Sequence, residues 1–220
     1  IQHPYRPYPG TQVLVHLARQ GRLGAVMHLH GQQVRKGTQI PYLAHLLAVA
    51  SLVLEHGATE DEAIAALLHD AIEDQGGAAT REQIRLRFGP TVERIIVECS
   101  DAETMPKPPW RERKEAYIAH IAASSPSARL VSMADKLHNA RAILADYRLI
   151  GNALWTRFTG GCEGTLWYYR TLADTYRAVQ PHPLADELAR VVAEIERLVS
   201  CPEAVAPSAA GLPCEPEERP

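Results

Sequence analysis

The 220-residue sequence is poor in cysteine, with four residues at positions 99, 162, 201 and 214. No two of them form a CxxC pair, and none has a histidine at zinc-finger spacing. The pattern therefore indicates neither a zinc knuckle nor a disulfide framework. A reducing compartment suits such a chain, and we expect it in the cytoplasm.

Long apolar runs and an excess of positive charge are also missing. No stretch approaches the ~20 apolar residues of a membrane span, and the first ten residues are polar and proline-rich, unlike a signal peptide. Because residue 1 is Ile, we expect the natural start to be missing. The 23 Lys and Arg against 26 Asp and Glu give a net charge of −3, whereas nucleic-acid binders are visibly basic. The sequence predicts neither a membrane nor a nucleic-acid partner, and it leaves a small anionic substrate open.

The sequence has no sustained alternation of apolar and polar residues, whereas the helical period recurs along the chain. It therefore predicts an all-α fold, a bundle of about eight to ten helices. A Thr59–Glu62 capping box begins one helix that ends at Gly76, and Thr80–Gln83 repeats the device before Gly89. Further helices are expected at about 11–34, 41–56, 90–99, 110–124, 127–148, 163–179 and 184–200.

Composition divides the chain into one domain with two tails. We expect residues 1–10 to form an N-terminal tail and residues 11–200 a single domain. A domain of this length buries enough surface to fold without metals or disulfides, so a metal here would serve chemistry. Five of the last 19 residues are proline, and we expect residues 201–220 to be a disordered tail.

The most informative segment is Ala63–Asp74, where four ionisable residues follow an apolar helical run. On a continuous helix His69, Asp70, Glu73 and Asp74 share one arc of about 140°. The arc could face water, as at many charged helix ends, or a metal. Acidic groups at a helix C-terminus oppose the macrodipole at a cost of a few tenths of a kcal/mol each, which a bound dication would reverse.

Two other positions offer ligands of the same kind. His45 lies in a helix that is apolar nearly all round, where a histidine is usually a hydrogen-bonded core residue. Asp135 shares a helix face with Asn139 and could equally pair with a lysine at the surface. Together, His45, His69, Asp70 and Asp135 form a two-histidine, two-carboxylate set that suits Mn²⁺, Fe²⁺ or Zn²⁺ and leaves positions for water and substrate.

Four ordered blocks resemble a known family. Residues 35–37, 41–45, 67–74 and 134–141 are similar to the RKG, PYxxH, LLHDxxED and ADKLHNxR blocks of the Rel/Spo hydrolase domain, a group of the HD-domain phosphohydrolases. Members of that group cleave the 3′-pyrophosphate from the alarmones ppGpp and pppGpp. The resemblance covers roughly residues 12–180 and implies an HD-type helical bundle.

The resemblance also implies roles for individual residues. His45, His69, Asp70 and Asp135 would hold one Mn²⁺ per chain, while Glu73 and Asp74 would position or deprotonate the attacking water. A dication polarises a phosphoryl oxygen and acidifies bound water, and a neighbouring carboxylate can accept the proton. Cleavage would give GDP or GTP and pyrophosphate.

Substrate contacts follow from the same comparison. The candidates are Arg35, Lys36, Tyr42 and Asn139, with Lys107, Arg113 and Lys114 of a basic segment that could receive the pyrophosphate. Each has a plainer alternative: solvated charges in a turn or at a helix start, a packing tyrosine, or an asparagine bonded to backbone.

The chain departs from the family pattern at Ser132–Met133 and at 97–101, and neither change removes a proposed ligand. A chain ending near residue 200 has no room for synthetase and regulatory domains. We therefore expect a small alarmone hydrolase that does not synthesise alarmones, and a homo-oligomer is one possible state. Two alternatives stay open: hydrolysis of another nucleotide phosphate, and a catalytically silent nucleotide sensor.

Overall fold

The computed structural model describes residues 33–35, 37–74, 77–100 and 108–200, and these residues form an all-α fold. In chain order the elements are α3 (Tyr42–Glu55), α4 (Glu60–Leu68), α5 (Ala71–Asp74), α6 (Ala78–Phe88), α7 (Pro90–Cys99), α8 (Trp110–Ile121), α9 (Pro126–Ile150), the 3₁₀ helix η1 (Gly151–Arg157), α10 (Gly161–Val179) and α11 (Pro183–Ser200). Extended pairing in this part of the chain is limited to one isolated bridge between Val34 and Pro41. The expected fold class is confirmed.

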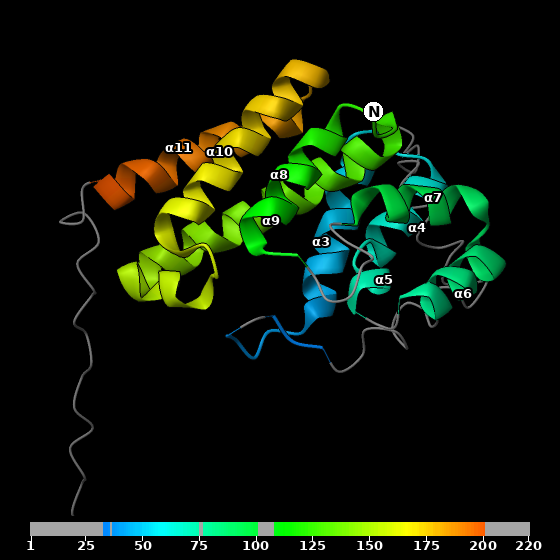
Figure 1. Ribbon diagram of the computed structural model, residues 1–220, viewed down its shortest axis with the longest axis horizontal. Helices are drawn as coiled ribbons and strands as arrows, with labels where there is room; N and C mark the ends of the chain where they lie inside the picture. Colours follow the sequence, from blue (N-terminus) through cyan, green and yellow to red (C-terminus); the bar gives the residue numbers. More distant parts are fainter. Residues whose placement is uncertain (1–32, 36, 75–76, 101–107, 201–220) are drawn as a thin grey trace, which may run out of the picture.

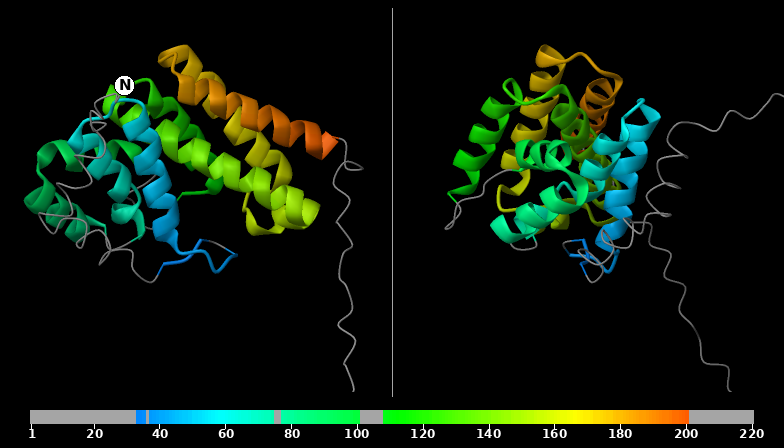
Figure 2. Two further views of the ribbon diagram at one scale, coloured as in Figure 1. Left: turned by 180° about the vertical axis from the view of Figure 1, so that it is seen from behind. Right: turned by 90° about the vertical axis from the view of Figure 1, so that its right-hand side faces the viewer.

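The long helix α9 organises the molecule. It begins where the Ser125 side chain accepts a hydrogen bond from the Ala128 N–H, with Pro126 in the first turn. Its 25 residues cross the bundle, with α10 and α11 on one side and α3, α4 and α7 around the other part (Figures 1 and 2). Residues on successive faces are buried, including Val131, Met133 and Leu137. Because α9 is covered from several directions, polar groups along it must find partners inside the protein.

The helix expected from Thr59 to Gly76 is broken in two. Its start is as expected, because the Glu62 N–H donates to Thr59 Oγ1 at 3.3 Å and the Thr59 N–H donates to Glu62 Oε2 at 2.7 Å. The prediction of one continuous helix is wrong: α4 ends at Leu68, and a turn at His69 and Asp70 precedes α5. The break buries His69 while the apolar face of α5 stays in the core.

The prediction of a second capping box at Thr80–Gln83 is also wrong. Helix α6 begins at Ala78 after Gly77, and Thr80 lies inside the helix with 5% exposure. Gly77 has φ 57°, a positive value that suits glycine, and its N–H donates to Ile72 O at 3.0 Å. Backbone geometry at the glycine therefore sets the start of α6, and the Thr80 side chain packs inward.

The segment before α3 forms a turn, and only residues 33 and 34 of it fall within the helix expected over 11–34. The Arg35 N–H donates to Ile40 O at 2.9 Å and the Tyr42 N–H to Gln33 O at 2.7 Å, which closes a turn around Gly37. Gly37 has φ 73°, and a Cβ there would lie 3.0 Å from the Arg157 side chain, so the turn requires glycine. Residues 11–32 of that expected helix, and both expected tails, lie outside the described residues.

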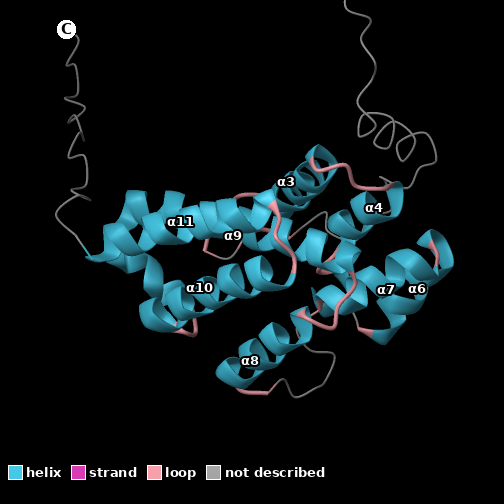
Figure 3. Cartoon of the chain, turned by 90° about the horizontal axis from the view of Figure 1, so that it is seen from above, coloured by secondary structure: helices cyan, strands magenta, loops and turns pink. Residues whose placement is uncertain are grey.

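The helices pack around α9 and share one hydrophobic core. Viewed from above, α6 and α7 lie at the end opposite to α11, and α8 lies beside α10 (Figure 3). The aromatic residues Trp155 and Tyr168 are buried in the shared core. Among the described helices, no segment combines the length and the apolar character that a membrane span requires.

Candidate metal centre

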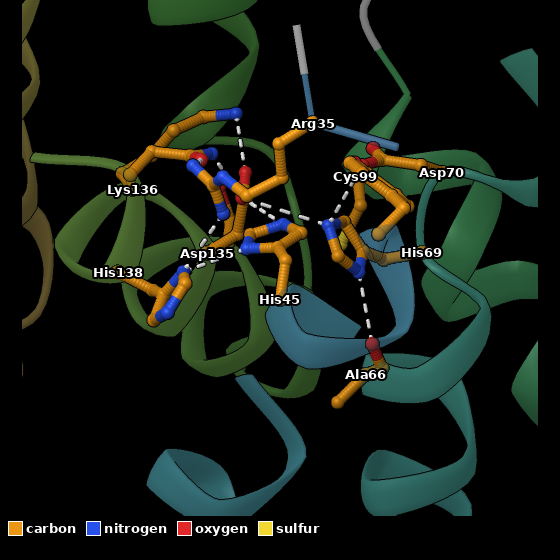
Figure 4. Close-up of polar contacts among 12 residues, drawn as sticks. Arg35, His45, Ala66, His69, Asp70, Cys99, Asp135, Lys136 and His138 are labelled. Atoms are coloured by element: carbon orange, nitrogen blue, oxygen red, sulfur yellow. Dashed lines mark hydrogen bonds and ion pairs between the residues drawn. The ribbon is translucent and has the colours of Figure 1, made fainter. Parts of the chain in front are cut away.

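Three helices bring four potential ligands to one point. His45 comes from the middle of α3, His69 and Asp70 from the turn after α4, and Asp135 from the third turn of α9. His45, His69 and Asp135 are buried, with exposures of 0%, 3% and 4%, while the Asp70 side chain is 29% exposed. Figure 4 shows these side chains converging between the helices. One side of the cluster is therefore closed, and Asp70 marks the open side.

The distances within the cluster are short. His45 Nε2 lies 3.2 Å and His69 Nε2 lies 3.5 Å from Asp135 Oδ1. His69 Nε2 also lies 3.1 Å from Asp70 Oδ2. One ligand atom from each of His45, His69 and Asp70 falls within 4.8 Å of the others. The four residues that the sequence singled out as a set therefore meet in space.

Both histidines present an unpaired nitrogen to the cluster. His45 Nε2 and His69 Nε2 are buried, and within the described part of the chain neither makes a hydrogen bond. The other nitrogen of His69, Nδ1, lies 2.8 Å from Ala66 O, a carbonyl that can only accept. Nδ1 therefore carries the hydrogen, and Nε2 of the neutral ring offers a lone pair. Two histidine nitrogens directed at two carboxylates suit a divalent cation.

Electrostatics keeps the carboxylates charged. Burial alone would raise the pKa of Asp135, but the Lys136 ammonium, 2.6 Å from Asp135 Oδ2, holds that pKa well below its usual range. Burial would likewise raise the pKa of Asp70, and His69 outweighs burial and lowers it. Burial would lower the pKa of His69, but Asp70 and Asp135 raise it well above the ordinary value. Without a metal the carboxylates favour a proton on His69, and a cation would take the place of that proton.

Hydrogen bonds from neighbouring side chains orient the carboxylates. Tyr42 donates its hydroxyl hydrogen to Asp70 Oδ2. Asn139, one turn after Asp135 on α9, donates from Nδ2 to Asp135 Oδ1 at 2.6 Å. Arg35 donates from Nη2 to Asn139 Oδ1 at 3.0 Å. Three expected substrate residues therefore also contact the cluster or its first neighbours.

The same three residues line a cavity of about 290 Å³. Its wall continues away from the cluster along α9 and η1, through residues that the sequence analysis did not assign, among them Asp146, Leu154, Arg157, Phe158 and Tyr169. Arg157 Nη1 donates to Asp146 Oδ2 at 3.0 Å. A cavity lined by both charged and apolar side chains has the character of a small-molecule site.

The remaining expected site residues are not among the cluster residues, and some of them lie outside the part of the chain that the structure describes. Glu73 is half-buried in α5, close in sequence to the two ligand candidates of the preceding turn. Lys36, Lys107 and the side chain of Asp74 lie outside the described residues. Arg113 donates to Pro108 O at 3.1 Å, and the Lys114 ammonium lies 4.9 Å from the centre of the Tyr168 ring. These contacts tie Arg113 and Lys114 to the start of α8 and to α10, and their substrate role stays a prediction.

Sequence reasoning missed His138 beside the cluster, and it expected a lysine partner of Asp135 only at the surface. Lys136 pairs with Asp135, and His138 Nδ1 lies 2.8 Å from His45 Nδ1. Burial, followed by the nearby His45 and Arg35, lowers the pKa of His138 to about 4, so its ring is neutral at pH 7. Both residues belong to the 134–141 block, and the i, i+3 spacing from Asp135 to His138 was the available signal.

The HD-domain family model matches residues 24–153, which is more than half of the chain and includes all four cluster residues. The chain belongs to the HD-domain family. Membership implies a divalent metal ion, and the His45, His69 and Asp70 cluster is a fitting place for one.

Named relatives of this HD-domain chain include animal enzymes. The chain is 43% identical over 115 residues to guanosine-3′,5′-bis(diphosphate) 3′-pyrophosphohydrolase MESH1 of Xenopus tropicalis and 39% identical over 115 residues to human MESH1. Each match covers 51% of this chain and 62% of the relative, so the chain spans somewhat less than two thirds of these proteins. A Haemophilus influenzae enzyme named guanosine-3′,5′-bis(diphosphate) 3′-pyrophosphohydrolase is 33% identical over 120 residues, 52% of this chain and 17% of its own length.

Solved structures support the HD-domain fold. Lmo0812 from Listeria monocytogenes EGD-e superposes with a TM-score of 0.62 at 29% identity, covering 70% of this chain and 99% of the other. A metazoan orthologue of SpoT, described as hydrolysing ppGpp, superposes with a TM-score of 0.66 at 24% identity over 90% of this chain and 99% of its own. At that identity the second likeness shows the fold alone.

Proposed function

We propose that this protein is a manganese-dependent 3′-pyrophosphohydrolase of guanosine 3′,5′-bis(diphosphate), acting on ppGpp or pppGpp in the cytoplasm. The observation that carries the proposal is the convergence of two buried histidine nitrogens and two carboxylates, next to a cavity whose lining includes Tyr42 and Asn139. The four sequence blocks and the names of the relatives support the substrate.

His45, His69, Asp70 and Asp135 would hold the ion, in keeping with the ligand types that manganese accepts. When bound, Mn²⁺ supplies a Lewis acid for a phosphoryl oxygen and lowers the pKa of a water ligand. Tyr42 holds Asp70 in place through its hydroxyl. Asn139 likewise fixes the orientation of Asp135, so the two carboxylates need little rearrangement on binding.

The protein's own side chains would move the proton. Water attacks the phosphorus attached to the ribose 3′-oxygen, the bond between them breaks, and the 3′-oxygen leaves as the hydroxyl of GDP or GTP after taking a proton. Glu73, three residues beyond Asp70, would accept the proton of the attacking water, with Asp74 beside it. The released group is pyrophosphate, and Lys36, Lys107, Arg113 and Lys114 are the proposed sources of positive charge for it.

The cavity would hold the nucleoside and its 5′-phosphates. Arg35 stands where it can contact both the cluster neighbour Asn139 and the cavity, and a guanidinium can stack on a base or bind phosphate through two hydrogen bonds. The apolar walls formed by residues such as Leu154 and Phe158 suit the faces of a purine.

The test is incubation of the purified protein with ppGpp and Mn²⁺, followed by analysis of the products. We expect GDP and pyrophosphate in equal amounts, and none with EDTA. Glu73→Gln should lower turnover about 100-fold or more while leaving Mn²⁺ affinity unchanged, because a general base contributes a factor of about 10² to 10⁴. Glu82→Gln, at an exposed position of α6, serves as the matched control.

Two outcomes would overturn parts of this proposal. Absence of both products from wild-type protein excludes ppGpp as the substrate, and a panel of other nucleotide phosphates then distinguishes a different hydrolase from a silent sensor. Unchanged turnover in Glu73→Gln excludes Glu73 as the base.

A further inference from the structure

One wall of the cavity beside the metal centre is a single face of α9. Four lining residues of this helix are spaced by three or four positions and so form one stripe: Asn139, Ala142, Ile143 and Asp146. Asn139 is next to the metal centre, because it donates to Asp135 Oδ1 at 2.6 Å. Asp146 lies seven residues further along, which is about 10 Å of helix axis. The stripe therefore leads from the metal ligands to a second carboxylate.

Asp146 is held at the cavity wall by Arg157. Its Oδ2 accepts from Arg157 Nη1 at 3.0 Å, and the Asp146 and Arg157 side chains are 37% and 27% exposed. The stem of Arg157 packs against the turn before α3, since a Cβ added at Gly37 would lie 3.0 Å from Arg157 Cδ and Nε. Two carboxylate oxygens accept about four hydrogen bonds, so the ion pair leaves Asp146 able to accept from a ligand.

Charge limits which part of a substrate Asp146 can contact. Among the described residues that line the cavity, it is the one carboxylate, and Arg35 and Arg157 supply positive charge. A carboxylate repels a phosphate group, because both are anions and neither has a hydrogen to donate. Asp146 therefore suits an uncharged part of a nucleotide that offers hydrogens, which is either a ribose hydroxyl or the edge of a base.

The position of Asp146 favours the base. In the proposed reaction the phosphorus attached to the ribose 3′-oxygen lies at the metal, so the ribose lies next to the metal and the base lies further away. Asp146 is separated from the metal neighbour Asn139 by two turns of α9. Leu154 and Phe158 line the same cavity, and their apolar side chains suit the faces of a purine.

Guanine is the purine whose edge matches a carboxylate. It presents two hydrogens side by side, one on N1 and one on the amino group at C2, and the two oxygens of Asp146 can accept both. Adenine presents the lone pair of N1 at the same place, which a carboxylate repels.

We propose that Asp146 is a specificity-determining residue, which accepts hydrogen bonds from N1–H and the C2 amino group of guanine and so selects guanine over adenine nucleotides. The inference rests on the proposed function and deepens it, since it names the side chain that reads the base.

The first measurement is the binding of nucleoside 5′-diphosphates to the Mn²⁺-loaded protein by titration calorimetry. These compounds lack the 3′-pyrophosphate, so binding is measured without hydrolysis. We expect wild type to bind guanosine 5′-diphosphate at least tenfold more tightly than inosine 5′-diphosphate, which lacks only the C2 amino group. Adenosine 5′-diphosphate should bind more weakly still.

Asp146→Asn keeps the shape of the side chain and replaces one acceptor by a donor. We expect its affinity for guanosine 5′-diphosphate to fall at least tenfold. Its affinity for xanthosine 5′-diphosphate, which has an oxygen at C2, should rise at least tenfold over that of wild type. A residue that only holds Arg157 in place would lower the affinity for all four nucleotides equally. Asp174→Asn, at an exposed position of α10, is the matched control and should change none of them.

The second measurement is hydrolysis of the corresponding 3′,5′-bis(diphosphates). Asp146→Asn should raise KM for the guanosine compound at least tenfold and change kcat by less than about threefold, because the base edge is remote from the bond that breaks. Thermal unfolding reports whether each variant folds. If Asp146→Asn does not fold, Asp146→Ala takes its place, and it should bind the guanosine and inosine 5′-diphosphates equally.

Three results would overturn the inference: equal binding of the guanosine and inosine 5′-diphosphates by wild type, no binding of any of the four, or an equal loss for all four in Asp146→Asn. If wild type shows the expected preference in binding but hydrolyses none of the 3′,5′-bis(diphosphates), the proposed function fails and the role of Asp146 stands. If wild type hydrolyses all of them equally well, the role of Asp146 fails and the proposed activity stands.

Discussion

The two carboxylate oxygens of Asp135 have different partners. Its Oδ2 pairs with Lys136 at 2.6 Å, while Oδ1 accepts from Asn139 and faces both histidine nitrogens. Lys136 offsets the cost of burying the charge, and the second oxygen remains directed at the cluster. At the residue scale, the site depends on buried groups that are each satisfied on one side and open on the other.

Asp135→Asn should therefore weaken metal binding while keeping the shape of the side chain. We expect the Mn²⁺ dissociation constant to rise about 100-fold or more, since losing a charged ligand costs more than losing a neighbour of a ligand, for which 10- to 100-fold is usual. Titration calorimetry measures the change, and Asp174→Asn on the exposed face of α10 is the control. Tight Mn²⁺ binding by Asp135→Asn would show that Asp135 is not a ligand.

A second residue-scale prediction concerns pH and lies far from the cluster. Burial, and then the neighbouring His56, lower the pKa of His182. The unfolded chain therefore binds a proton at higher pH than the folded chain, so stability falls as the pH drops from about 7 through the lowered pKa. His182 Nδ1 also accepts from the Leu184 N–H, a bond that protonation would remove.

Urea unfolding at pH 7.5 and pH 5 measures this effect. The loss of unfolding free energy between the two should be smaller in His182→Asn, which keeps an acceptor for the Leu184 N–H but does not titrate. His120→Asn, at an exposed histidine, should lose as much as wild type. An equal loss in His182→Asn would contradict the prediction.

Local sequence signals predict the start of helix α4 correctly, but they do not predict where it ends. Its Thr59 capping box forms as the sequence indicates, because both partners lie within four residues of each other. The same pattern at Thr80 does not form, since α6 begins earlier, directly after Gly77 with its positive φ, and Thr80 is buried. The break after Leu68 likewise follows from packing, which turns His69 inward against α3 and α9.

Thr59→Ala should destabilise the protein through the start of α4. Loss of an N-cap side chain costs about 1 kcal/mol of unfolding free energy. Chemical denaturation measures the difference, with Thr91→Ala at an exposed position in the first turn of α7 as the control. A change within error of zero would show that Glu62 or water replaces the cap.

For the whole molecule, the metal centre lies where α3, the end of α4 and α9 meet. A cation that binds the folded chain and not the unfolded one stabilises the assembly of these helices. Because α9 packs against α3, α4, α7, α10 and α11, binding of a cation at the cluster is linked to the stability of the bundle.

Mn²⁺ should therefore raise the midpoint of thermal unfolding. At 100 times the dissociation constant the gain is about 2.7 kcal/mol, which corresponds to a rise of about 5 to 10 °C for a chain of this size. Differential scanning calorimetry with Mn²⁺ or EDTA tests this, and Asp135→Asn should show no rise. An equal shift in wild type and Asp135→Asn would place the ion elsewhere.

The sequence by itself determined the helical class and the kind of chemistry. Helical periodicity and caps depend on residues within one or two turns, and the donor types of a metal site belong to the side chains themselves. The HD-domain family was also readable from four short blocks.

Only the tertiary structure decided that His45, His69 and Asp135 meet, because their approach depends on how α3, α4 and α9 pack and no local signal encodes it. The same holds for the cavity wall at Asp146 and Arg157 and for the contact between His45 and His138, 93 residues apart. His45 directs Nε2 at Asp135 and Nδ1 at His138, and this orientation depends on how α3 packs against α9.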